Sequence, residues 1–190
     1  MLQIFSRKDR SRRFSYRCAC CGEVHSGSPI IGYKRPNHYF TVPEGDRDDR
    51  VTIDDDLCEI RPPADNLELG TSFFIRTTLD VPIHGADEPF SWGVWVSQSE
   101  QSFCRYVDTF DDDQSGMGSF GWLVASMPSY GRLDENGGIE SVACDVVWKG
   151  DGQRPTLEVH ECDHPLFVDQ RDGISWERAV GLAQQALHPN

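Results

Sequence analysis

Phe73-Phe-Ile-Arg-Thr-Thr-Leu-Asp-Val81 is the stretch of sequence that decides the fold. Successive side chains of a β-strand point to opposite faces of a sheet, so every second residue shares a face. One face of this strand would carry Phe73, Ile75, Thr77, Leu79 and Val81. Phe90-Ser-Trp-Gly-Val-Trp-Val96 repeats the same period of two. Both stretches are bounded by turn-forming residues, and this pattern predicts half-buried antiparallel strands.

Further strands and two helices follow from similar patterns. Residues 142–148 alternate again, and a fourth strand is predicted around residues 157–159. Ser97 and Glu100 have the spacing of a capping box, which predicts a helix that begins there and continues to about Phe110. Ser175 is a suitable N-cap for a final helix with one apolar stripe. The sequence therefore predicts an α+β fold, with an antiparallel sheet of about four to six strands covered by two helices.

The first third of the chain lacks this regularity. Residues 1–13 are rich in Arg and Lys without hydrophobic periodicity, so we expect a disordered basic arm. The remaining residues, 14–190, are expected to form a single domain. Within it, residues 14–60 hold closely spaced Gly and Pro and would form an irregular, turn-rich segment with a cysteine knuckle, whereas residues 71–187 would supply the sheet and helices.

The charge restricts the possible partners of the protein, and the cysteine content indicates its location. The formal net charge of −13 would repel phosphate groups, so the folded body is not expected to bind nucleic acid or an anionic membrane. The sequence holds no apolar run long enough for a membrane span and no signal-like start. Seven cysteines, an odd number, are typical of a reducing compartment, and we expect a cytoplasmic protein. The sequence does not indicate its oligomeric state.

The strongest local motif is Cys18-Ala-Cys-Cys21-Gly22. The spacing of Cys18 and Cys21 lets two thiolates face one tetrahedral metal ion, and the glycine after them suits the tight turn. His25 and the more distant Cys58 could complete the set of ligands, which predicts a structural zinc site. Two alternatives remain open at this point: cysteines that simply occupy a turn, and a redox-active dithiol.

A second motif places His164 close to Asp169. A carboxylate near a histidine can orient the imidazole and raise its basicity, so the pair could act as a general base. No recognisable nucleophile motif accompanies the pair, and the alternative is a histidine that caps a turn before the last helix. Whether the protein is an enzyme is therefore uncertain, and the sequence favours a protein without catalytic activity.

Several of these motifs occur together in a known family. The chain resembles the bacterial family called domain of unknown function 2199 over about residues 14–182. The motifs that carry the resemblance are Tyr16-Arg-Cys18, Cys21-Gly-Glu-Val-His25, Asp56-Leu-Cys58, Phe73-Phe-Ile-Arg76, Trp92-Gly-Val-Trp-Val-Ser97, Gly121-Trp-Leu123, His164-Pro-Leu166, Asp169-Gln170 and Gly173-Ile-Ser175. The resemblance implies a single-domain bacterial protein, and it implies no activity, substrate or cofactor.

Three functional hypotheses follow. The first is a non-catalytic binding protein with a structural zinc knuckle and a basic protein as its partner. The second, a special case of the first, is an immunity-type protein that neutralises a basic toxin, which the acidic charge favours. The third is a metal-dependent enzyme that uses the Cys/His site or His164, and this hypothesis requires an open coordination position on the metal.

Overall fold

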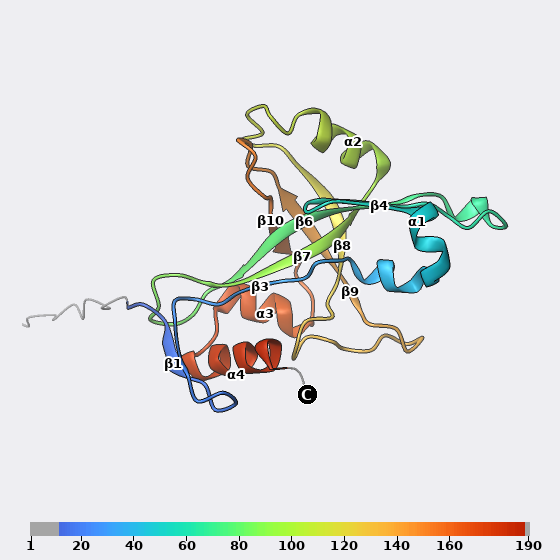
Figure 1. Ribbon diagram of the computed structural model, residues 1–190. Coiled ribbons are helices and arrows are strands. Elements are labelled where there is room, and N and C mark those ends of the chain that lie inside the picture. Colours follow the sequence, from blue (N-terminus) through green and yellow to red (C-terminus); the bar gives the residue numbers. More distant parts are fainter. Residues whose placement is uncertain (1–11, 189–190) are drawn as a thin grey trace, which may run out of the picture.

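The computed structural model describes residues 12–188, which contain ten β-strands and four α-helices (Figure 1). The strands are β1 (Ser15–Arg17), β2 (Val24–Ser26), β3 (Ile30–Gly32), β4 (Val51–Ile53), β5 (Leu57–Ile60), β6 (Ser72–Val81), β7 (Phe90–Gln98), β8 (Gly118–Val124), β9 (Ser141–Val147) and β10 (Thr156–Val159). The helices are α1 (Arg47–Arg50), α2 (Glu100–Asp108), α3 (Pro165–Asp172) and α4 (Trp176–Leu187). The chain is therefore α+β, as predicted.

Five of the strands close into a barrel in the order β6-β7-β8-β9-β10. The long antiparallel pair β6–β7 forms one side, with a register that runs from Phe73 opposite Gln98 to Val81 opposite Phe90. The ring closes where β10 pairs in parallel with β6, at Thr156 and Thr78. The alternation that predicted β6 is confirmed, because Ile75, Thr77, Leu79 and Val81 are all buried.

Each of the two long strands pairs with two shorter strands along the edge that faces away from its long partner. On β7 this edge pairs with β3 near Ser91 and with β8 at Val96. The free edge of β6 pairs with β5 near its start and with β10 further on, while β4 adds to β5. The resulting sheet has eight strands and two parallel pairings, which corrects the expectation of an antiparallel sheet of four to six strands. Strands β3, β4 and β5 are only three or four residues long, too short to show a period in the sequence.

Helices α2, α3 and α4 lie at the two ends of the barrel, whereas α1 lies beside β4. Figure 1 shows α2 at one end, with α3 and α4 together at the other. The predicted helix after β7 is present, but its N-cap is Ser99, whose hydroxyl accepts a hydrogen bond from the N–H of Ser102 at 3.1 Å. Ser97 belongs instead to β7. Ser175 caps α4 as predicted, by accepting from the N–H of Arg178. Within residues 12–188 there are thus two further helices, α1 and α3, beyond the two expected.

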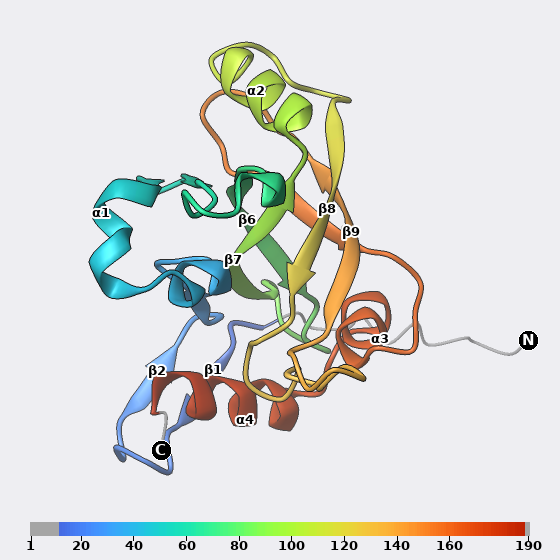
Figure 2. The ribbon, with the colours of Figure 1, turned by 90° about the vertical axis from the view of Figure 1, so that its right-hand side faces the viewer.

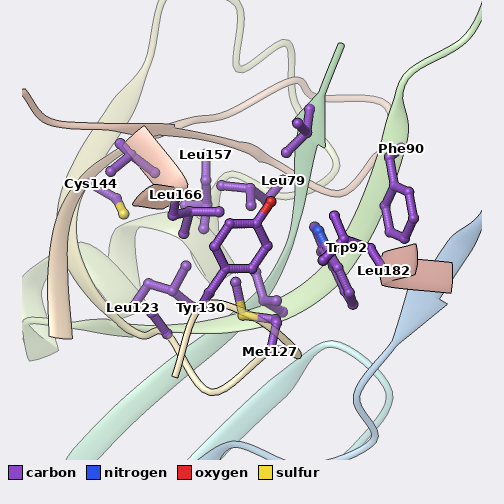
Figure 3. Packing of buried hydrophobic residues seen from close by; sticks show 14 of the residues in the cluster. Leu79, Phe90, Trp92, Leu123, Met127, Tyr130, Cys144, Leu157, Leu166 and Leu182 are labelled. Carbon is purple, nitrogen blue, oxygen red and sulfur yellow. The ribbon is translucent and has the colours of Figure 1, made fainter. Parts of the chain in front are cut away.

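The main core fills the barrel and continues beneath α3 and α4. Figure 3 shows Tyr130 and Met127 packed between Leu123 on one side and Trp92 on the other. A smaller second cluster lies on the outer face of β5, β6 and β7 and consists of Val42, Cys58, Ile60, Phe74 and Trp95. This cluster explains why Phe74 is buried although its side chain points to the other face of β6 from that of Ile75.

The N-terminal hairpin, β1–β2, packs against α4, and the two lie side by side in Figures 1 and 2. The rings of Phe14 and Trp176 have centroids 4.7 Å apart. The guanidinium of Arg12 lies 4.4 Å from the centre of the Trp176 ring. Residues 1–11 of the predicted basic arm lie outside the described residues, whereas Arg12 belongs to this packed region.

Candidate metal centre

The two cysteines of the knuckle lie in the turn that joins β1 to β2. The N–H of Cys18 donates to the carbonyl oxygen of Glu23 at 2.8 Å, and the N–H of Gly22 donates back to the carbonyl of Cys18 at 2.9 Å. Gly22 has a φ of +76°, a conformation in which a residue with a Cβ is disfavoured. The glycine thus allows the sharp turn that brings the side chain of Cys21 back toward Cys18.

Four potential ligand atoms gather at this turn. They come from Cys18, Cys21, His25 and His188, and all lie within 4.8 Å of one another. The Sγ of Cys21 is 3.5 Å from the Nε2 of His25. In a tetrahedral site with metal–ligand bonds of about 2.0–2.3 Å, neighbouring ligand atoms are roughly 3.3–3.8 Å apart. The cluster could therefore hold one metal ion after small side-chain adjustments.

His188 is the member of this cluster that the sequence did not predict. It is the C-cap residue of α4, so it comes from the opposite end of the chain. Its Nε2 atom is buried and has no hydrogen-bond partner. Buried polar atoms nearly always have a hydrogen-bond partner, so an unpaired ring nitrogen beside two thiols has the surroundings expected of a metal ligand. Only its position just after a predicted terminal helix could have drawn attention to it.

The surroundings favour a thiolate at Cys18. Hydrogen bonds from the backbone N–H groups of Cys21 and Cys20, with a smaller contribution from the nearby His188, outweigh the effect of burial and lower the pKa of Cys18 to about 7. Metals bind thiolates rather than thiols, so this environment prepares Cys18 for coordination. Tyr16 stacks on His25 with ring centroids 5.1 Å apart and thereby restricts the orientation of the imidazole.

Cys58, predicted as a further ligand, lies elsewhere. It is on β5, fully buried in the second apolar cluster beside Phe74 and Trp95. Burial raises the pKa of its thiol to about 12, so it behaves as an apolar core residue. Its place is determined by the pairing of β5 with β6, which holds Cys58 opposite Phe74. The fourth position of the cluster is taken by His188 instead.

His164 and Asp169, the candidate general-base pair, have separate structural roles. His164 is fully buried and caps α3: its Nδ1 accepts from the N–H of Leu166, and its Nε2 donates to the carbonyl of Tyr130, each at 3.1 Å. Desolvation lowers the pKa of His164, which keeps the ring neutral. Asp169 accepts a hydrogen bond from Arg178 at 2.8 Å and one from the hydroxyl of Tyr130 at 2.9 Å. The capping interpretation of His164 is therefore the one that the geometry favours.

Comparison with known proteins places the chain in a family. A family model described as an uncharacterized protein conserved in bacteria, DUF2199, matches residues 17–174. The chain belongs to the DUF2199 family. In this DUF2199 protein the matched span includes Cys18, Cys21 and His25 and ends before His188. No curated protein and no solved structure matches the chain. Within residues 12–188, none of the helices combines the length and the apolar character that a membrane crossing requires.

Proposed function

We propose that this DUF2199 chain is a non-catalytic binding protein whose two ends are joined by a structural Zn²⁺ ion. The observation that carries the proposal is the convergence of Cys18, Cys21, His25 and His188, with all ligand atoms within 4.8 Å. Two thiolates and two imidazoles form a donor set that Zn²⁺ commonly occupies with tetrahedral geometry. Softer thiolates also exclude Mg²⁺ and Ca²⁺, which prefer oxygen ligands.

A structural role follows from the number of ligands. Catalytic zinc sites keep one position for water or substrate, whereas four protein ligands close the coordination sphere. Here all four would come from the protein, two from the β1–β2 turn, one from β2 and one from the end of α4. The ion would then hold the hairpin against α4, in the same region where Phe14 packs on Trp176.

The alternative, a metal-dependent enzyme, has weaker support. It needs either an open position at the cluster or a free acid–base pair at His164. The ring nitrogens of His164 are both engaged with backbone groups, and Asp169 is engaged with Arg178 and Tyr130. These contacts support structural roles for both residues.

The charge supports a basic protein as the partner. A net charge of −13 accelerates encounter with a positively charged protein and disfavours nucleic acid. An immunity-type role against a basic toxin is one case of this proposal. A cytoplasmic location belongs to the same proposal, because thiolate ligands stay available for zinc in a reducing compartment.

Metal analysis of the purified protein tests the zinc site. We expect about one zinc ion per chain in the native protein. Cys21→Ser and His188→Ala should each weaken zinc binding by more than the roughly 10- to 100-fold that loss of an outer-shell partner costs. Cys20→Ser is the matched control, because Cys20 is an exposed neighbouring thiol outside the cluster, and it should retain zinc.

Elemental analysis and a competition titration with a chromogenic chelator provide the measurements. A native protein without zinc would contradict the proposal. So would a Cys20→Ser variant that loses the metal as readily as Cys21→Ser does. Zinc that binds with three protein ligands and an exchangeable water would favour the enzyme alternative.

A further inference from the structure

The outer surface of β8, β9 and β10 carries an unusual group of exposed side chains. In the sheet register Phe120 lies opposite Asp145, and Asp145 lies opposite Glu158, so these three form a row across the strands. Trp122 lies two residues after Phe120 in β8, opposite Ala143. We call this surface the β8–β10 face, which consists of Phe120, Trp122, Asp145, Glu158 and His160.

Two large aromatic rings of this face are open to solvent. Phe120 is 47% exposed and Trp122 is 50% exposed, while Leu123 beside them points into the barrel and is buried. The two rings contact each other edge to face, with centroids 5.5 Å apart. In Figure 2, β8 and β9 cross the front of the molecule, with α2 above them and α3 and α4 below, so none of the helices within residues 12–188 covers them. Aromatic residues are depleted from ordinary surfaces and enriched at the centres of interfaces.

Acidic groups lie beside the aromatic rings. The side chain of Asp145 is 62% exposed, and its Oδ1 is 3.0 Å from the Nε2 of His160. The His160 ring in turn lies 5.6 Å from the ring of Phe120. Glu158 is also exposed, on the neighbouring strand. This surface therefore presents two exposed aromatic rings together with carboxylates that no Lys or Arg neutralises among the described residues.

We propose that the β8–β10 face is the docking surface for a basic partner protein that presents arginine side chains. A guanidinium is planar, stacks on aromatic rings and binds a carboxylate through two parallel hydrogen bonds. Phe120 and Trp122 supply the rings, and Asp145 and Glu158 supply the carboxylates within the same strand register. Lysine carries the charge but lacks the planar group that stacks on a ring and binds a carboxylate through two parallel hydrogen bonds, so arginine is the better match. This inference rests on the proposed role as a binding protein, and it names the surface and the partner's chemistry.

The test uses deca-arginine and deca-lysine peptides as probes with the full chain. Trp122 is the one half-exposed tryptophan among the described residues, and Trp122→Phe assigns its indole N–H signal in a ¹H–¹⁵N NMR spectrum. We expect deca-arginine to shift this signal and to bind more tightly than deca-lysine. Phe120→Ser combined with Trp122→Ser should weaken deca-arginine binding by about 3- to 30-fold, the range that cation–π contacts contribute.

A matched pair of charge variants separates this surface from general electrostatic attraction. Asp145→Asn with Glu158→Gln removes two negative charges from the face. Asp48→Asn with Asp49→Asn removes the same number from the exposed α1 segment. We expect the first pair to weaken deca-arginine binding at least severalfold more than the second, as measured by calorimetry at moderate salt.

Equal weakening by the two pairs would overturn the proposal, as would an indole signal of Trp122 that deca-arginine leaves unchanged. A dimer that the Phe120→Ser and Trp122→Ser double variant abolishes, seen by sedimentation, would also overturn it, because the face would then bind a second copy. Zinc content and melting temperature are measured on every variant. If the native protein contains no zinc but binds the peptide at Trp122, only the zinc proposal is contradicted. If the protein contains zinc but does not bind the peptide there, only the proposal for this surface is contradicted.

Discussion

His164 shows how a single buried side chain makes the stability of the fold depend on pH. The folded protein holds its ring neutral, since desolvation lowers its pKa below the usual 6.5 and its Nδ1 must accept from Leu166. The unfolded chain binds a proton more readily than the folded chain as the pH falls through 6.5. The stabilisation is therefore complete above that pH and is lost as the pH drops toward the folded-state pKa, by at most about 1.4 kcal/mol per pH unit.

The variant His164→Asn tests this prediction, because asparagine can still cap α3 but does not titrate. The free energy of unfolding of the variant, measured with urea between pH 7.5 and 5, should fall less steeply than that of the native protein. His38 also has a pKa lowered by burial, so His38→Asn is measured alongside to account for its share. Parallel curves for the native protein and His164→Asn would contradict the assignment.

At the scale of single residues, the sequence drew attention to three of the four side chains that gather in the candidate metal cluster and missed the fourth, His188. Cys18, Cys21 and His25 fall within one turn and its following strand, so their spacing alone brings them together. Whether Cys58 or His188 joins them depends on how β5 and α4 pack, and spacing carries no information about that. Cys58 faces apolar neighbours, whereas α4 ends beside the hairpin.

At the scale of elements, two glycines have opposite structural roles. A Cβ on Gly121 in β8 would overlap the carbonyl oxygen of Ser97 and lie 2.7 Å from the Nε2 of Gln98. Gly121 is what lets β8 approach the end of β7, so Gly121→Ala should destabilise the protein by about 1–3 kcal/mol. Gly181 lies inside α4, where a Cβ would meet no atom within 4 Å. Gly181→Ala should stabilise the protein by about 0.5–1 kcal/mol.

Thermal or urea unfolding of the two variants measures both effects. The opposite signs are the informative result, since a general intolerance of alanine would lower the stability of both. An unchanged stability of Gly121→Ala would mean that β7 and β8 are further apart at this point than the structure shows.

The elements that the sequence predicted well are those with long, unbroken periods. Strands β6 and β7 and helix α4 were all recognised, because each buries one face over many residues. The spacing of Ser97 and Glu100 is that of a capping box and predicts a start of α2 at Ser97, two residues too early. In the structure β7 continues through Gln98, and the Ser97 hydroxyl accepts from the N–H of Trp122 instead. Pairing between distant strands thus decided where the helix could begin.

At the scale of the whole molecule, removal of the metal should loosen one region and leave another intact. The proposed ion joins the hairpin to α4, whereas the barrel is held by its own ladders of hydrogen bonds. We expect a chelator to increase hydrogen exchange in β1, β2 and α4, with little change in β6 and β7. Exchange mass spectrometry of the native and chelated protein measures this, with His188→Ala reproducing the pattern. Uniform loosening of the barrel would show that the site supports the whole fold.

The overall architecture was only partly accessible from the sequence. The α+β class follows from the mixture of periods, but closure of the barrel depends on one short parallel contact between β10 and β6. That contact lies between residues nearly eighty positions apart, Thr78 and Thr156, and neither has a distinctive sequence context. Strands β3 and β5 pair with the free halves of β7 and β6, and β4 adds to β5; these pairings become visible only when the register is known.

The meeting of Cys18 with His188 has a mechanical consequence. With an ion bound, a pulling force applied to the two ends of the chain passes from one end to the other through metal–ligand bonds. The barrel between them carries no load until those bonds rupture. Stretching single molecules with and without a chelator should therefore give two different rupture patterns, with a late, abrupt extension only when zinc is present.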